Sequence, residues 1–459
     1  MFALPGIGAL IIFVLARPQE FFPLLQRVPF LYLFTAFAVI GYIIDIRLHR
    51  VLPIAANTLF WVGALLLWAI VSAAINEPDS FTQRLAELVM LFALYFTISH
   101  GIQRFRSFQL IAGVLAGTCL FIAFVCAHQG FSGKQCIGGE EQDGNIEGEP
   151  DGRECETVEE CRGPDSDPSM EYRCEKVGLF GTYSVEERVR YRGDLKDPNE
   201  VALTVCAGGM ALLIGFALRK RGATGALGYG SAVVLVFITV FLTQSRGGLI
   251  AAMLVPGIYL IRRYGLAIAI PCGLVALPVL LLGGRSGEAA DLSTEMRYDA
   301  WGAGLDMWKH SPIYGVGPRA FTDHHYLTAH NSFVLSFAEL GFVGFFLFVA
   351  VIYLCVKSLI VGLRTLRDVP DSKGAQTWGM ALLAGFAGML FQISTLSFTY
   401  HPMLWMYIAL ISGWYLAVRS HVPTFEVKIK GLDAVVIASL CAAYILVVLP
   451  LFLRAKGEL

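Results

Sequence analysis

Three histidines and an Asn-Ser pair stand together directly before a long apolar run. The stretch 315–341 reads GVGPRAFTDHHYLTAHNSFVLSFAELG and contains His324, His325, His330 and Asn331-Ser332. Titratable and hydrogen-bonding groups at the mouth of a membrane span are costly to desolvate, which favours a chemical role for this cluster over a packing role. A neutral imidazole there can accept a proton near physiological pH.

Arginines are expected on the same face of the membrane as these histidines. Arg190 and Arg192 lie in RVRYRGDLKDPNEVAL, where alternate positions of an extended chain point to one side. Arg246 lies in a Ser-Arg-Gly-Gly turn whose glycines allow close backbone approach. Arg297 begins a segment whose apolar spacing predicts a short interfacial helix over 296–308. Guanidinium groups bind phosphate in pairs of hydrogen bonds, so the set suits a lipid-linked phosphate or pyrophosphate, although snorkelling to lipid headgroups is the structural alternative.

The composition is that of a membrane protein. The chain has 459 residues, of which 56% are hydrophobic and 15% charged, whereas a soluble domain has about 25% charged residues. Its net charge of -1 gives no sign of nucleic-acid binding. Apolar runs recur at 4–16, 30–46, 54–75, 88–102, 108–127, 201–218, 226–242, 248–261, 266–282, 333–356, 378–393, 404–418 and 435–453. We therefore expect an all-α polytopic membrane protein with about 12–13 transmembrane helices. Long outer loops would follow helix 5 and helix 9, the second loop carrying the interfacial helix.

The distribution of lysine and arginine predicts the orientation. Basic clusters fall in every second short connection, which places those connections in the cytoplasm. The clusters are Arg47 and Arg50, Arg104 and Arg106, Arg219 to Arg221, Arg262 and Arg263, Lys357 to Lys373, and Arg419 to Lys430. The chain then divides into N-terminal helices (1–128), an outer loop that ends in a basic segment (129–200), central helices (201–283), an outer catalytic loop (284–331) and C-terminal helices (332–459).

Four of the ten cysteines lie in the first outer loop, and six lie in apolar runs, where they are expected to be small buried hydrophobes. On an oxidising face, four cysteines predict two disulfides, and three pairings are possible. A zinc site is less favoured because the loop has no histidine and no CxxC spacing. The candidates for disulfide formation are Cys136, Cys155, Cys161 and Cys174.

The same loop is strongly acidic over 134–176, where fourteen acidic and five basic residues give a net charge of -9. The glycine-interrupted stretch EEQDGNIEGEPDG over 140–152 could wrap calcium, but it does not match the EF-hand spacing. A disulfide-linked, solvated insertion is the simpler interpretation.

Four segments, in this order, resemble the O-antigen ligase and polymerase superfamily of bacterial inner-membrane glycan transferases. They are YRGDLKDPNEVAL, TQSRGGLIAAML, MRYDAWGAGLDMWKHSPIYGVGPRAF and AHNSFVLSFAELGFVGFFL, with a weaker match in HPMLWMYIAL. An early segment, ARPQEFFP over 16–23, resembles the ligase-like proteins associated with exopolysaccharide or protein-sorting loci. The acidic cysteine-bearing insertion departs from the family pattern.

The resemblance implies roles for particular residues. The functional histidine falls on His330, although His324 and His325 lie close enough for the assignment to shift by one turn. The catalytic arginines that bind pyrophosphate fall on Arg192 and Arg297. The further substrate-binding candidates are Arg190, Arg246, Asn199, His325 and Asn331.

The implied reaction needs no metal and no cofactor. A glycan leaves an undecaprenyl-pyrophosphate donor, arginines stabilise the charge on the diphosphate, and His330 takes the proton of the acceptor hydroxyl, with inversion at the anomeric carbon. The expected partners are this donor, a glycan, lipid or protein hydroxyl acceptor, and membrane lipid, with no nucleic acid. A repeat-unit polymerase is the near alternative. A transporter of lipid-linked glycans is less favoured, because the polar cluster lies on one face and no internal repeat is seen. A scaffold whose acidic loop captures a partner is also less favoured, because it would leave the arginines unexplained.

Overall fold

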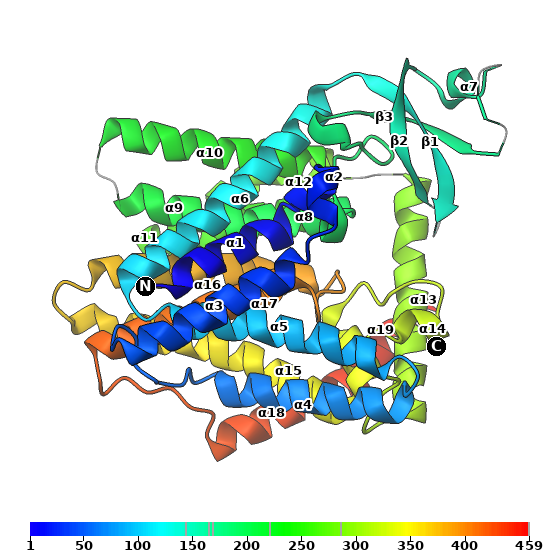
Figure 1. Cartoon of the computed structure of the whole chain (residues 1–459). Coiled ribbons are helices and arrows are strands. Elements are labelled where there is room, and N and C mark those ends of the chain that lie inside the picture. Colours follow the sequence, from blue (N-terminus) through cyan, green and yellow to red (C-terminus); the bar gives the residue numbers. More distant parts are fainter. Residues whose placement is uncertain (143–144, 164–165, 168, 220–221, 285–286, 458–459) are drawn as a thin grey trace. The chain divides into compact units, whose positions relative to one another are not determined.

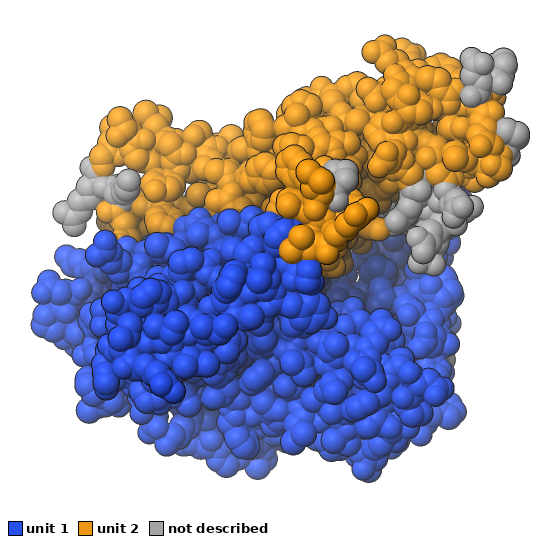
Figure 2. Space-filling model, viewed as in Figure 1, with its two compact units in different colours: residues 1–14, 29–115, 285–459 blue, residues 15–28, 116–284 orange. Residues whose placement is uncertain are grey.

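The protein is described from a computed structural model of residues 1–459. The structure describes residues 1–142, 145–163, 166–167, 169–219, 222–284 and 287–457. The chain forms two compact units, which Figure 2 shows in different colours. Unit 1 contains residues 1–14, 29–115 and 285–459, and unit 2 contains residues 15–28 and 116–284. Each unit therefore gathers segments that lie far apart in the sequence.

Unit 1 is built from helices (Figure 1). They are α1 (Ala3–Leu15), α3 (Phe30–Arg47), α4 (Leu59–Asn76), α5 (Phe81–Gly101), α13 (Glu288–His310), α14 (Phe321–His324), α15 (Ser332–Thr365), η5 (Leu366–Asp368), α16 (Lys373–Ile393), α17 (Pro402–His421), α18 (Gly431–Ala443), the π-helix η6 (Tyr444–Val448) and α19 (Leu449–Lys456). Helix α6 (Phe105–Phe131) begins in unit 1 and continues into unit 2.

Unit 2 combines helices with a small sheet. Its helical elements are η1 (Pro18–Glu20), α2 (Pro23–Gln26), α7 (Val158–Cys161), η2 (Leu179–Gly181), η3 (Gly193–Leu195), α8 (Pro198–Thr204), the π-helix η4 (Val205–Met210), α9 (Ala211–Arg219), α10 (Ala223–Leu242), α11 (Arg246–Tyr264) and α12 (Leu266–Gly283). Its strands are β1 (Lys134–Gln142), β2 (Asn145–Glu154) and β3 (Glu171–Lys176).

Every apolar run of the sequence forms a helix, which confirms the all-α polytopic class. Within the described residues, 8 helices are long and apolar enough to cross a membrane, fewer than the thirteen runs. Helix α1, with 13 residues, is too short to cross a membrane. Helix α17 has 20 residues, or about 30 Å at 1.5 Å per residue, yet it is not among these 8 helices. Its residues Met403–Val418 are all buried inside the protein, so its outer surface need not match lipid.

The connections of unit 1 meet in two groups. In one group the basic loops after α3, α5 and α17 and the C-terminal part of α15 are joined by hydrogen bonds. In the other group the ends of α4 and α16 meet the 311–331 connection. The contacts are Gln103 Nε2 to Leu52 O (2.6 Å), Ser420 Oγ to Gln103 O (3.4 Å) and Lys357 Nζ to Lys428 O (3.1 Å) in the first group, and Ser72 Oγ to Tyr314 O (2.7 Å) and Thr328 Oγ1 with Ser397 Oγ (2.9 Å) in the second.

Helix α13 is longer than the interfacial helix predicted over 296–308, since it spans Glu288–His310. Figure 1 shows that it runs across the direction of α4, α5 and α15 in the same unit. This orientation and its mixed apolar and charged sequence are those expected of a helix that lies along a membrane surface.

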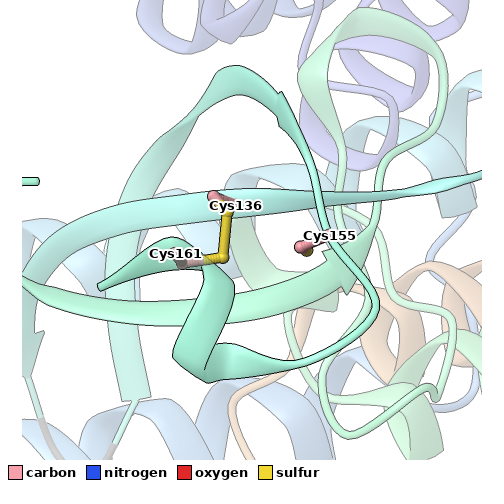
Figure 3. A group of neighbouring side chains, drawn as sticks. All are labelled: Cys136, Cys155 and Cys161. Carbon is pink, nitrogen blue, oxygen red and sulfur yellow. A yellow bond between two sulfur atoms is a disulfide. The ribbon is translucent and has the colours of Figure 1, made fainter. Parts of the chain in front are cut away.

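The cysteine-bearing insertion forms an antiparallel sheet with strand order β2-β1-β3, which the sequence did not predict. Two disulfides, Cys136–Cys161 and Cys155–Cys174, cross-link it. Figure 3 shows the first disulfide with Cys155 beside it. The four cysteines and Tyr172 make up the small core of the sheet. The possible calcium-binding stretch 140–152 lies partly outside the described residues, at 143 and 144.

Candidate active site

His330 lies at the start of α15 in a conformation that few side chains adopt. Its φ is 45°, in the left-handed region, where a non-glycine residue costs about 1–3 kcal/mol. The next residue, Asn331, caps the helix, because its side-chain oxygen accepts the N–H groups of Phe333 (2.9 Å) and Val334 (3.2 Å). Strain of this kind persists only when surrounding contacts hold the backbone in place, so the neighbours of the His330 segment must supply such contacts.

One of those neighbours is α13, which carries Arg297. The Trp301 Nε1–H donates to the carbonyl of Ala329, the residue before His330, at 2.8 Å. Arg297 precedes Trp301 by four residues and therefore shares its face of the helix. A Cβ atom at Gly304 would lie 2.6 Å from Val334, so α13 packs directly on the first turn of α15. The structure thus brings the Arg297 face of α13 to the His330 segment.

The connection between α16 and α17 fixes the same helix start from another side. Ser332 Oγ donates to Leu396 O (2.6 Å) and accepts from Phe398 N (2.8 Å). Thr399 Oγ1 donates to Ser332 O (3.0 Å). Ser332 and Thr399 are both buried, so these bonds are shielded from water.

The other two histidines differ from His330. His324 is exposed. The His325 Nδ1 accepts the Leu327 N–H at 3.1 Å, and its Nε2 lies 3.2 Å from Asp299 Oδ2 on α13. His325 therefore helps to tie the connection to α13.

A buried glutamate, which the sequence analysis did not single out, holds the start of the 311–331 connection. Helix α15 breaks at Gly341, whose φ is 65°, and carbonyl groups of the preceding turn accept the N–H groups of Val316 and Gly317. Glu339, 1% exposed, accepts the Phe321 N–H through its carboxylate at 3.1 Å. A charged residue inside an otherwise apolar run was the signal in the sequence.

In unit 2, the arginines of the basic segment (188–192) have different hydrogen-bond partners. Arg188 donates to Thr243 O (3.0 Å) and Asn199 Oδ1 (3.3 Å). Arg190 is buried, donates to Tyr183 O (3.2 Å) and stacks on the Tyr183 ring at 4.5 Å. The turn that leads into the segment is irregular, because Glu186 and Glu187 both have left-handed φ values.

Arg192 faces the turn formed by η2. Its Nη2 donates to Phe180 O (2.8 Å) and Gly181 O (3.0 Å). These carbonyl groups hold the guanidinium without neutralising its charge.

Arg246 and Asn199 lie at helix starts. Ser245 caps α11 by accepting the Gly248 N–H at 3.0 Å, and Arg246, the first residue of that helix, is exposed. Asp197 caps α8 and accepts the backbone N–H of Asn199 at 2.7 Å. Through Arg188, the turn before Arg246 and the start of α8 are joined in one network. The sequence analysis did not assign Arg188 to the site.

Within the described part of the chain, Arg190, Arg192 and Arg246 make no ion pair. Other arginines do pair with carboxylates: Arg17 with Asp194 (2.8 Å), Arg84 with Glu77 (2.9 Å) and Arg319 with Glu87 (3.2 Å). Positive charge without a protein counter-charge is suited to bind an anion.

The insertion anchors the beginning of the basic segment. Glu175 on β3 is buried and accepts hydrogen bonds from Ser184 Oγ (2.5 Å) and Glu186 N (2.8 Å). Lys134 on β1 donates to Glu187, and this bond lowers the pKa of the Glu187 carboxyl below its ordinary value. The sheet therefore positions the turn that leads into Arg188, Arg190 and Arg192.

Each unit thus gathers its own share of the predicted residues. Unit 1 holds Arg297, His325, His330 and Asn331, linked through Trp301 and Asp299. Unit 2 holds Arg190, Arg192, Asn199 and Arg246 around the basic segment.

Unit 1 also has a small pocket lined mainly by apolar residues. Helices α4 and α5 supply most of its walls, and aromatic residues of the α16–α17 region close one side. The lining residues include Val62, Leu65, Leu66, Ala69, Leu88, Leu91, Phe92, Leu340, Tyr400 and Trp405.

Comparison with known proteins gives one family. Residues 231–349 match the family model described as O-antigen ligase. The matched stretch runs from α10 to the middle of α15 and contains Arg246, Arg297, His325, His330 and Asn331. No curated protein matches the chain.

Proposed function

We propose, starting from the membership of the O-antigen ligase and polymerase superfamily that this match supports, that the chain transfers a glycan from an undecaprenyl-pyrophosphate donor to an acceptor hydroxyl group. The family implies a glycosyltransferase or ligase-type enzyme with a lipid-linked glycan donor and a glycan acceptor in general. The chain is a multi-pass membrane protein. The particular donor, the mechanism and the ligase activity, as distinct from polymerase activity, are parts of the proposal.

The observation that carries the proposal is the environment of Arg192. Its guanidinium is held by the carbonyl groups of Phe180 and Gly181, so its charge remains for an anionic ligand. In the proposed reaction, Arg192 and Arg297 are each proposed to bind phosphate of the donor, and Arg190 and Arg246 are proposed to add positive charge. Asn199 contributes an amide at the donor. These groups stabilise the negative charge that grows on the diphosphate as the glycosidic bond breaks.

His330 is the proposed general base. Its neutral imidazole takes the proton of the acceptor hydroxyl while the oxygen attacks the anomeric carbon, and the configuration inverts. Trp301 and Asn331 support this role by fixing the chain on both sides of His330. His325 supports it by tying the connection to Asp299.

The chemistry is proposed to take place on the periplasmic face of a bacterial inner membrane. The basic loops of unit 1 belong to one group of connections, and the 311–331 connection belongs to the other. Because basic loops remain in the cytoplasm, the 311–331 connection is assigned to the outside. The disulfides of the insertion agree with an oxidising compartment.

Glycan transfer by the full chain, reconstituted in membranes with a polyprenyl-pyrophosphate-linked glycan, tests the proposal. Wild type should release polyprenyl pyrophosphate and form a new glycosidic bond, and His330→Ala and Arg192→Ala should each lose at least about 100-fold in rate. His324→Ala and Arg162→Ala are the matched controls, since both residues are exposed and outside the proposed machinery.

The products separate the alternatives. Transfer to a separate acceptor identifies a ligase, whereas joined repeat units identify a polymerase. If His330→Ala and Arg192→Ala retain wild-type rates, the assignment fails. Movement of intact donor across the membrane without bond formation would identify a transporter instead.

A further inference from the structure

The early segment 16–21, ARPQEF, lies against the arginine that is proposed to bind the donor diphosphate. Both segments belong to unit 2, although about 170 residues separate them in the chain. The Tyr191 hydroxyl donates to the Ala16 carbonyl at 2.8 Å. The Arg17 guanidinium bridges Glu20 (2.7 Å) and Asp194 (2.8 Å).

An aromatic ring lies beneath the Arg192 guanidinium. The centroid of the Phe21 ring is 5.3 Å from the Arg192 Cζ atom. The same ring packs on Phe180 at 4.9 Å and meets Tyr191 edge-on at 6.0 Å. Phe180, whose φ is 60°, supplies one of the two carbonyl groups that Arg192 contacts. Phe21 therefore supports both the guanidinium and the strained turn that holds it.

The fit between the two segments is close. Gly193 has a φ of 60°, and a Cβ atom there would lie 2.2 Å from the Arg17 Cδ atom. The side chain of Arg17 thus fills the space that any other residue at 193 would need. Residues 191, 192, 193 and 194 are each contacted by the early segment.

The charge of the early segment indicates that it does not bind the diphosphate itself. Arg17 is bridged by two carboxylates, Glu20 and Asp194, so these three residues together carry a net negative charge. A diphosphate is not attracted to such a group. Arg192, by contrast, makes no ion pair within the described residues, and a ring face stabilises a cation without neutralising it.

We infer that residues 16–21 are a positioning element, in which Phe21 and Arg17 hold the Arg192 guanidinium in place for the donor diphosphate. This inference rests on the proposed function, because it assumes that Arg192 binds the donor. Phe21 and Arg17 do not touch the substrate in this scheme. They act through Arg192.

The test is the affinity of the full chain in detergent for undecaprenyl pyrophosphate, which requires no turnover. Phe21→Leu removes the ring but keeps an apolar side chain, and we expect it to weaken binding about fivefold, a loss typical of one cation–π contact. Phe21→Tyr keeps the ring and should bind as wild type does. Phe216→Leu is the matched control, since Phe216 stacks on Tyr229 at 5.8 Å elsewhere in unit 2.

A double-mutant cycle then separates positioning from a general structural effect. In the Arg192→Ala background, Phe21→Leu should have no further effect. An equal loss in both backgrounds would overturn the inference, as would wild-type binding by Phe21→Leu when Arg192→Ala is impaired. If Arg192→Ala itself binds as wild type does, the proposed role of Arg192 fails first, and that outcome is distinct from the other two.

Discussion

The two groups of candidate residues are held in place by different means. In unit 1, His330 follows a carbonyl bound by Trp301 and precedes a capped helix start that buried hydroxyl groups fix. In unit 2, Arg190 and Arg192 lie on an irregular segment and are held by carbonyl groups and aromatic rings. The histidine group is built for a fixed geometry, and the arginine group is built to keep its charge.

This difference predicts different kinetic effects. A group that must align with a reacting hydroxyl should affect kcat when its support is removed. Groups that bind the donor in both the ground state and the transition state should affect its KM as well. Changes to the support of His330 should therefore lower kcat with the donor KM unchanged, whereas changes to the support of Arg190 and Arg192 should also raise the KM for the donor.

The largest effect is expected at His330. Both His330→Ala and His330→Gly should lower kcat by about 100-fold or more, because the general base is lost. The two variants should differ in stability, since glycine adopts the φ of 45° without strain. We expect His330→Gly to be more stable than His330→Ala by about 1 kcal/mol, measured by thermal unfolding in detergent. Equal stability of the two variants would show that the left-handed conformation is not maintained.

The second largest effect is expected from removal of a disulfide in unit 2. Replacing Cys136 and Cys161 by serine should destabilise the insertion by about 3 kcal/mol, because the bond closes a loop of 25 residues. Glu175, one residue after Cys174, anchors the basic segment, so the donor KM should rise while kcat changes little. Proteolysis at the insertion and transfer kinetics check this, with Cys272→Ser, an exposed free cysteine, as the control. A fall in kcat with an unchanged donor KM would contradict the expectation that the arginine group mainly affects the KM for the donor.

A smaller effect is expected at Trp301. Trp301→Phe removes the hydrogen bond to Ala329 O, worth about 1 kcal/mol, and should lower kcat about fivefold with the donor KM unchanged. Trp308→Phe is a matched control on the same helix, because the Trp308 Nε1 is buried and has no partner within the described residues. If both variants lose activity equally, the loss reflects packing of α13 and not the position of His330.

The membrane made much of the fold predictable from the sequence. Every apolar run became a helix, because backbone groups in lipid must be satisfied within the segment. The sheet was not predictable in the same way. Strand β1, KQCIGGEEQ, has few of the β-branched and aromatic residues that are typical of strands, and disulfides supply its core instead.

The types of the candidate residues were predictable, but their partners were not. Arg188, Arg190 and Arg192 look equivalent at alternate positions, yet left-handed residues at 186 and 187 precede them and a left-handed glycine follows at 193. The contact of Trp301 with Ala329 and that of Phe21 with Arg192 join segments that only the folded chain brings together. Spacing within one segment carries no signal of such contacts.

The smallest expected effect concerns the ion pair between Lys134 and Glu187. Its hydrogen bond lowers the pKa of Glu187 below the ordinary 4.5, so its stabilisation is complete above that pH and is lost as the pH falls through the lowered pKa. Glu187 is 58% exposed, and screening by solvent limits the contribution to about 0.5 kcal/mol. At pH 7, Glu187→Gln should increase hydrogen exchange at residues 185–188 about twofold, and the difference from wild type should disappear below the lowered pKa. Glu426→Gln, which removes an exposed pair with Lys428, should leave this exchange unchanged. A difference that persists in acid would show that Glu187 supports the arginine segment through contacts other than its charge.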